Sequence, residues 1–136
     1  MNFRKIFRQV VSAMFIVAIL LANSVSHADI KTYEGLGVYY LHDGETTDCG
    51  KEKADLLAER DAIEQVKLYI KSNSRVVNSK LLEDEIITIA AGILRVIETK
   101  HAIEVEDDAL IVKAFVTATI DTDELEILLD TAIKNR

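Results

Sequence analysis

The residues best suited to chemistry lie close together in the sequence, where His42, Asp48 and Cys49 surround a turn and the start of a helix. The positive end of a helix favours the thiolate form of cysteine, so Cys49 is the candidate nucleophile. Catalysis would also need a base held by a third group, and His42 is the nearest base. A zinc site needs three or four ligands, and no second strong pair accompanies these residues. We therefore interpret the group as a surface turn beside a helix cap, and we expect neither a thiol enzyme nor a metal site.

Three acidic groups occur, and none has the spacing of a calcium-binding loop. They are Glu83 to Glu85, Glu104 and Glu106 to Asp108, and Asp121 with Asp123 and Glu124. We interpret them as solvated turns and helix starts; the alternative is a weak calcium contact between the second and third groups. Gly35 and Gly37 lack the third glycine of a phosphate-binding loop. We accordingly predict no enzyme activity, no metal and no cofactor.

Cys49 is the only cysteine in the chain. An exported protein meets an oxidising environment, but one cysteine cannot form a disulfide within its own chain. Cys49 either pairs with a second chain or stays a free, partly buried thiol. We expect the free thiol, so that packing alone must stabilise the fold.

Residues 1–28 have the layout of a secretory signal peptide. Arg4, Lys5 and Arg8 precede an apolar run at 10–22, and Ser26-His27-Ala28 supplies small residues before a cleavage point between Ala28 and Asp29. The apolar run is shorter than the roughly 20 residues of a spanning helix. We predict a periplasmic or extracellular protein; the alternative is an uncleaved signal, which would be its only membrane contact.

The charge of the chain argues against nucleic acid as a partner. Removing the three basic residues of the signal, which has no acidic residue, moves the net charge from −7 to −10. Phosphate backbones and anionic lipid headgroups attract cations and repel such a surface. We therefore expect a protein partner in the cell envelope, and the oligomeric state stays open.

Residues 29–136 are expected to form a single α+β domain of order β-α-α-β-β-α. We predict a strand at 30–41, and then a helix that is capped by Thr47 or Asp48 and runs to Ser72. A connection at 72–79 follows, partly extended, and a second helix begins at Asn78 or Ser79. A β-hairpin at 93–105 and 110–120 precedes a last helix that Asp121 opens. The sheet should be small, three-stranded and mainly antiparallel, with the helices packed on one face.

Small residues form the clearest packing pattern. Gly35 and Gly37 share one face of the first strand, because strand side chains alternate. Ala54, Ala58 and Ala62 share one face of the helix, together with Leu57, Gln65, Val66 and Tyr69. We predict that this helix crosses the first strand at the two glycines. Gly92 is expected to end the second helix as its C-cap.

These same residues carry a family resemblance. The run Glu34-Gly35-Leu36-Gly37, the alanine helix, Tyr69 to Ser72, Val77-Asn78, Ile86 and Gly92-Ile93 resemble the N-terminal domain of flagellar assembly protein T and related small outer-membrane lipoprotein antigens. The similarity covers residues 33–120. It implies an exported domain with helices against a small sheet and a non-enzymatic role in the envelope, such as assembling or stabilising a surface apparatus. The chain lacks the family's lipid-bearing cysteine near the cleavage point, so no binding residues are carried over.

The expected function is an exported, non-enzymatic structural or interaction module of the envelope, possible support for a surface or flagella-like apparatus. The alternative is a module that binds a small envelope ligand such as a lipid or glycan. The aromatic residues Tyr33, Tyr39, Tyr40 and Phe115 motivate it, since together they could line a pocket.

Overall fold

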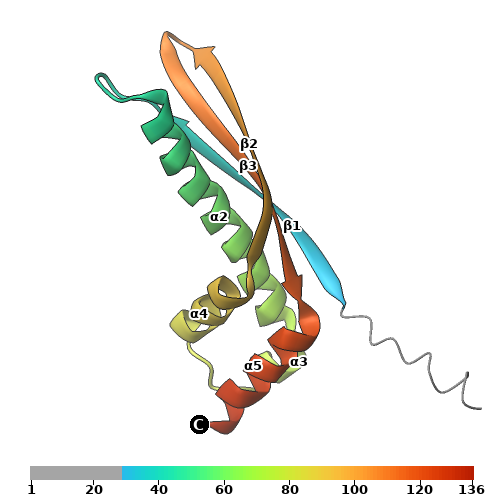
Figure 1. The fold of residues 1–136 in the computed structure, drawn as a ribbon. Helices are drawn as coiled ribbons and strands as arrows, with labels where there is room; N and C mark the ends of the chain where they lie inside the picture. Colours follow the sequence, from blue (N-terminus) through green and yellow to red (C-terminus); the bar gives the residue numbers. More distant parts are fainter. Residues whose placement is uncertain (1–28) are drawn as a thin grey trace, which may run out of the picture.

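The computed structural model describes residues 29–136, and the expected signal peptide at 1–28, with Ala28, lies outside the described residues. The α+β fold and the antiparallel three-stranded sheet are confirmed (Figure 1). The elements in chain order are β1 (Ile30–Tyr40), α2 (Thr47–Ser72), α3 (Ser74–Val77), α4 (Glu83–Ile93), β2 (Arg95–Glu106), β3 (Ala109–Asp121) and α5 (Thr122–Lys134). None of the described helices combines the length and apolar character needed to cross a membrane.

The strand order is β1-β3-β2, so β3 is central and pairs with both neighbours. Its alternating apolar residues Val112, Ala114, Val116, Ala118 and Ile120 are all buried, as the period of two requires. The hairpin between β2 and β3 turns through Asp107 and Asp108, which have φ values of 47° and 63°. Two residues with positive φ form the tight turn whose twist matches that of paired strands.

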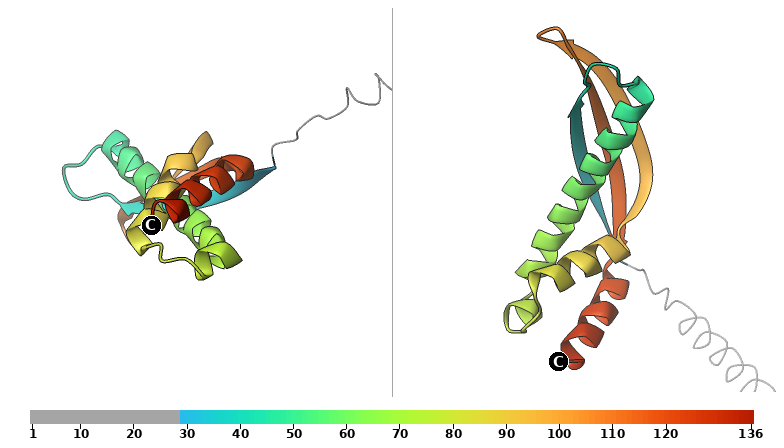
Figure 2. Two further views of the ribbon diagram at one scale, coloured as in Figure 1. Left: turned by 90° about the horizontal axis from the view of Figure 1, so that it is seen from below. Right: turned by 90° about the vertical axis from the view of Figure 1, so that its left-hand side faces the viewer.

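The long helix α2 runs along one face of the sheet (Figure 2). It begins one residue before the expected range, because the Thr46 hydroxyl accepts a hydrogen bond from the Cys49 backbone N–H at 3.2 Å. Gly50, Ala54, Ala58, Ala62, Val66 and Ile70 form its buried stripe. Leu57, which the periodicity assigned to the same face, is exposed instead.

The polar run at 72–79 contains a short helix, α3, where we expected a partly extended connection. The Asn73 side chain accepts a hydrogen bond from the Arg75 backbone N–H at 3.0 Å and caps this helix. Val76 is buried in the core, and Arg75 forms ion pairs with Glu126 and Asp130 of α5. Through these contacts, the run holds α5 close to the C-terminal end of α2.

The second predicted helix, α4, differs from the sequence expectation at both ends. It begins at Glu83 instead of Asn78 or Ser79, and the Glu85 carboxylate accepts a hydrogen bond from the Leu82 backbone N–H at 2.8 Å. It ends at Ile93 with Leu94 as C-cap, so Gly92 lies inside the last turn and is not the cap. A Cβ added to Gly92 would meet nothing within 4 Å, and Gly92 therefore takes no part in close packing.

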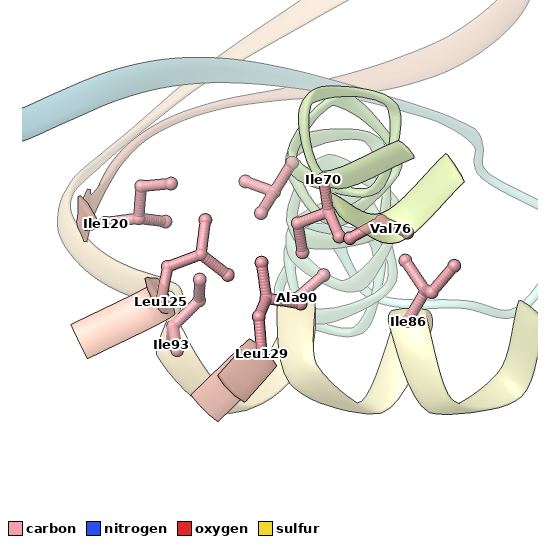
Figure 3. Packing of buried hydrophobic residues seen from close by; sticks show 9 residues of the cluster. Ile70, Val76, Ile86, Ala90, Ile93, Ile120, Leu125 and Leu129 are labelled. Carbon is pink, nitrogen blue, oxygen red and sulfur yellow. The ribbon is translucent and has the colours of Figure 1, made fainter. Parts of the chain in front are cut away.

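The core has two parts of different thickness. Under α2, small side chains from the helix meet the centre of the sheet: Ala54, Ala58, Val112, Ala114, Val116 and Ala118. At one end of the sheet, α4 and α5 close over larger side chains, among them Ile70, Ile93, Ile120, Leu125 and Leu129 (Figure 3). The thin part brings α2 close to the sheet, and the thick part supplies most of the apolar volume.

Candidate interaction surface

The crossing of α2 over β1 leaves no room for a ligand. A Cβ on Gly35 would lie 2.0 Å from the backbone oxygen of Ala58, and a Cβ on Gly37 would lie 1.9 Å from that of Ala54. Ala54, Ala58 and Ala62 are fully buried. Helix backbone thus rests directly on strand backbone, which only glycine permits at these two positions.

Gly50 extends the same contact, and our sequence analysis missed it. A Cβ at Gly50 would lie 2.7 Å from a Leu41 methyl carbon and 2.9 Å from a Val112 methyl carbon. Gly50 stands four residues before Ala54 and therefore continues the spacing of Ala54, Ala58 and Ala62. That spacing is the signal that could have identified it.

No described helix lies across the opposite face of the sheet (Figures 1 and 2). Large apolar side chains on that face are exposed. Leu36 and Phe115 are cross-strand neighbours in register. Their exposed fractions are 48% and 47%, and that of Tyr40 is 55%. We call Leu36, Tyr40 and Phe115, with the strand backbone between them, the open face.

A shallow hollow lies on the open face. It has a volume of about 440 Å³, and its lining residues are Glu34, Gly35, Leu36, Lys100, Phe115, Val116 and Thr117. Leu36, Phe115 and Lys100 form one row across the three strands. The hollow therefore has an apolar floor and one charge of each sign, from Glu34 and Lys100, at its rim.

The four aromatic residues of the ligand-binding hypothesis do not line one pocket. Tyr33 and Tyr39 alternate with the open-face residues of β1 and pack against the two core clusters on the helix side. Tyr40 and Phe115 belong to the open face. The sheet thus separates the rings into two pairs, because neighbouring residues of a strand point to opposite faces.

The turn before α2 is held by an ionic cluster that the sequence analysis did not identify. The Tyr39 hydroxyl donates to the Glu45 carboxylate at 3.0 Å, and Lys53 donates to the Tyr39 oxygen at 2.7 Å and also to Glu45. The hydrogen bond from Lys53, with one from the His42 backbone, lowers the pKa of Glu45 to about 2. The same contact with Glu45 raises the pKa of Lys53. Both groups therefore stay charged around neutral pH and fasten the turn to α2.

The residues that we considered for catalysis or metal binding have other contacts. The His42 ring lies edge-on to the Tyr39 ring with 5.9 Å between centroids, and Asp48 pairs with Lys51 at 3.1 Å. Cys49 is a free, partly exposed thiol. Within residues 29–136, no three side chains of metal-binding type converge.

The acidic groups act as caps and ion-pair partners. The Asp121 carboxylate accepts hydrogen bonds from the backbone N–H groups of Asp123 and Glu124 at 2.9 and 3.2 Å, so it caps α5. Glu83 pairs with Lys71 at 3.0 Å, and the hydrogen bond from this lysine lowers the pKa of Glu83.

The two edge strands of the sheet differ in the contacts that α2 makes with them. On β1, the Asp61 carboxylate accepts from the Leu36 backbone N–H at 3.0 Å, and the Gln65 amide donates to the Glu34 backbone oxygen at 2.7 Å. These side chains of α2 occupy backbone groups that would otherwise be free to bind another strand. On β2, His101 contacts Asp55 of α2 at 2.6 Å through its side chain, and every residue of the strand except Ala102 is exposed.

No protein-family model, no curated protein and no solved structure matches the chain. The resemblance to the flagellar assembly protein T domain therefore stays a prediction from the residues quoted for it.

Proposed function

We propose that this protein is an exported, non-enzymatic module of the cell envelope that binds a protein partner through the open face. The observation that carries the proposal is the set of half-exposed apolar side chains of the open face, Leu36, Tyr40 and Phe115. Contiguous apolar surface with a polar rim is typical of interaction sites.

The chemistry of the open face favours a folded protein surface as partner. Aromatic residues are enriched in the centres of protein interfaces, and Phe115 and Tyr40 are of this kind. Lys100 and Glu34 at the rim can form hydrogen bonds or ion pairs with either sign of charge. The net charge of −10 after signal removal disfavours nucleic acid and anionic lipid headgroups.

The signal-like residues 1–28 support a periplasmic or extracellular location. The family resemblance further supports a role in assembling or stabilising a surface apparatus, and flagella-like assemblies are one class of candidate. Membrane contact is confined in this proposal to an uncleaved signal.

The test compares three versions of the full chain as bait in envelope extracts. One is unchanged, one carries Leu36→Thr with Phe115→Thr, and one carries Leu56→Gln. Threonine keeps strand propensity while removing apolar surface, and Leu56 is an exposed leucine on α2 that serves as the matched control. We expect one reproducible partner with the unchanged and Leu56→Gln baits and its loss with the threonine bait.

Recovery of no reproducible partner, or equal recovery by the threonine bait, would overturn the proposal. Circular dichroism spectra of the three baits should coincide, because the substitutions alter only exposed positions.

A small-ligand module is the second candidate, and the hollow beside Phe115 is the observation in its favour. It predicts that a fluorescent acyl chain or glycan fragment binds the unchanged chain and binds the Phe115→Thr variant more weakly. Absence of saturable binding to the unchanged chain would remove this candidate.

A further inference from the structure

Among the described residues, the edge formed by β2 lacks the side-chain hydrogen bonds that block β1, and its ladder with β3 is regular from Glu98 to Glu106. Its twelve residues contain no proline and no glycine. Four of its apolar side chains are exposed: Val96 at 43%, Ile97 at 63%, Ile103 at 47% and Val105 at 71%. Charged side chains and a bulge are common protections of such an edge and β2 has both, so a strand that pairs here must match the charges of β2.

Strand alternation fixes which backbone groups of β2 point outward. The backbone oxygen of Glu34 and the backbone N–H of Leu36 point away from β3, as their hydrogen bonds with α2 show. The backbone N–H and C=O groups of Gly35 and of its partner Val116 therefore point toward each other. In antiparallel sheets the direction of the backbone N–H and C=O groups alternates along each strand. The backbone groups of Lys113 and of its β2 partner Ala102 therefore also point toward each other. The backbone groups of His101 and Ile103 consequently point outward.

We propose that a second copy of this chain pairs antiparallel along β2, with Ala102 opposite Ala102 of the other copy. The pairing joins the two three-stranded sheets into one continuous sheet. It uses the edge of the sheet and leaves the open face uncovered, so it goes beyond the proposed function and can fail independently of it.

Charge complementarity supports this register; a register centred on Ile103 would likewise set Lys100 opposite Glu106, and the cross-linking below distinguishes the two. With Ala102 on the two-fold axis, Lys100 of each copy lies opposite Glu104 of the other, which gives two favourable cross-strand pairs. A register centred on Lys100 would place two lysines face to face, and one centred on His101 would place Glu98 opposite Glu104.

The proposed register has one unfavourable feature at its ends, where Glu98 lies opposite Glu106. Lys100 lies 3.0 Å from Glu98 in its own chain and offsets this repulsion. On the helix side, the register sets Thr99 opposite Val105 and His101 opposite Ile103. Ile103 and Val105 therefore gain cross-strand neighbours, which stabilise a sheet.

The experiment mixes two single-charge variants, both built on Cys49→Ser to exclude a disulfide through that residue. Lys100→Glu alone sets glutamates against each other across the axis, and Glu104→Lys alone sets lysines against each other. In the mixed pair, both contacts between positions 100 and 104 join opposite charges. We expect dimers of the parent, dimerisation weakened by about tenfold or more in each variant, and recovery on mixing.

Analytical ultracentrifugation of the full chain measures the association constants of the parent, of each variant and of the mixed pair. A parent that stays monomeric at several hundred micromolar, or variants that fail to associate on mixing, would overturn the proposal.

Cysteine cross-linking reads the register directly in the same Cys49→Ser background. Ala102→Cys should form a disulfide-linked dimer, since paired residues on the axis have Cα atoms about 4.5 Å apart and disulfides need roughly 4.4–6.8 Å. Thr99→Cys is the matched control, because its partner in this register is Val105. Cross-linking of Thr99→Cys as fast as that of Ala102→Cys, or of neither, would contradict the register.

Discussion

One added methyl group at Gly37 would lie 1.9 Å from the backbone oxygen of Ala54, far inside any allowed contact. Neither atom can move alone, because one belongs to a central part of β1 and the other to a buried turn of α2. The close packing of α2 on β1 thus requires glycine at positions 35 and 37, because glycine has only a hydrogen atom in place of a side chain.

Gly37→Ala should lower the free energy of unfolding by at least about 3 kcal/mol, because overpacking against backbone cannot relax through a side-chain rotation. Gly92→Ala is the matched control. It has open space around its Cβ position and lies in a helix, so the same substitution should raise stability by up to about 1 kcal/mol. Urea denaturation measures both, and equal effects of the two substitutions would contradict the packing account.

Glu45 provides a pH-dependent test at the same scale. Its pKa in the folded state is about 2, below its ordinary value of 4.5, because it accepts hydrogen bonds from Lys53 and the His42 backbone. Its contribution to stability is therefore complete above pH 4.5 and is lost as the pH falls toward 2. Wild type should have a higher melting temperature than Glu45→Gln at pH 7, and the difference should vanish near pH 2.

Glu52→Gln is the control for this pH series, since Glu52 is an exposed carboxylate of α2. Glu83 and Glu85, whose pKa values are also lowered, contribute equally to wild type and variant and cancel in the difference. A wild-type advantage that stays constant from pH 7 to pH 2 would show that the Glu45 contact is absent.

Residue-scale prediction succeeded where spacing alone carries the information and failed where it does not. The four-residue spacing of the alanines and the two-residue spacing of the glycines define faces without any tertiary knowledge. The prediction that Gly92 is a C-cap was wrong, because a glycine near a helix end is compatible with several positions relative to the cap. The Glu45 and Lys53 contact was missed, because it joins a loop to a helix through a tyrosine of β1.

At the scale of elements, α2 has two tasks, since it covers the sheet and blocks one of its edges. Asp61 and Gln65 occupy the outward backbone groups of Leu36 and Glu34. By placing the Asp61 and Gln65 side chains there, α2 prevents another strand from pairing with this part of β1. The edge of β2 is left for pairing.

Asp61→Ala should remove the acceptor of the Leu36 N–H and cost about 1 kcal/mol. The Leu36 amide should then exchange its hydrogen faster, whereas amides in the middle of β3 keep their protection. Residue-resolved hydrogen exchange measures this, with Glu52→Ala as a control on the same helix. Unchanged exchange at Leu36 would show that α2 does not protect this edge.

Most elements were predictable from periodicity, and their ends were less so. The long helix, the hairpin and the Asp121 cap follow from local patterns that agree with one another. The segment at 72–79 was not predictable, because serine and asparagine suit caps and turns of several kinds. Its helical turn depends on the burial of Val76 and on the ion pairs of Arg75 with α5, which are distant in sequence.

At the scale of the whole molecule, the sequence predicted a three-stranded sheet with helices on one side but did not show how much of the other side stays uncovered. The mixed residues on that side of β3 are compatible with water or with a partner. Only the register shows that Leu36, Phe115 and Lys100 form one row. The candidate surface was therefore not predictable from single-strand patterns.

The export proposal is tested by processing of the N-terminal segment. Ala28→Leu should block cleavage and leave the longer chain attached to membranes, because the residue before the cleavage point must be small. His27→Leu is the control, since the adjacent position accepts larger residues. Mass spectrometry of envelope fractions should find a chain that begins at Asp29 for wild type and His27→Leu only. Cytosolic wild type of full length would contradict export.

The measurement that tests the central claim most directly is photo-cross-linking in intact cells from a benzoylphenylalanine placed at position 115. The same probe at position 56, on the solvent side of α2, is the reference. The open-face account predicts a discrete envelope adduct from position 115 that is absent from position 56 and is lost when Leu36→Thr is added. No adduct from position 115, or the same adducts from both positions, would contradict it.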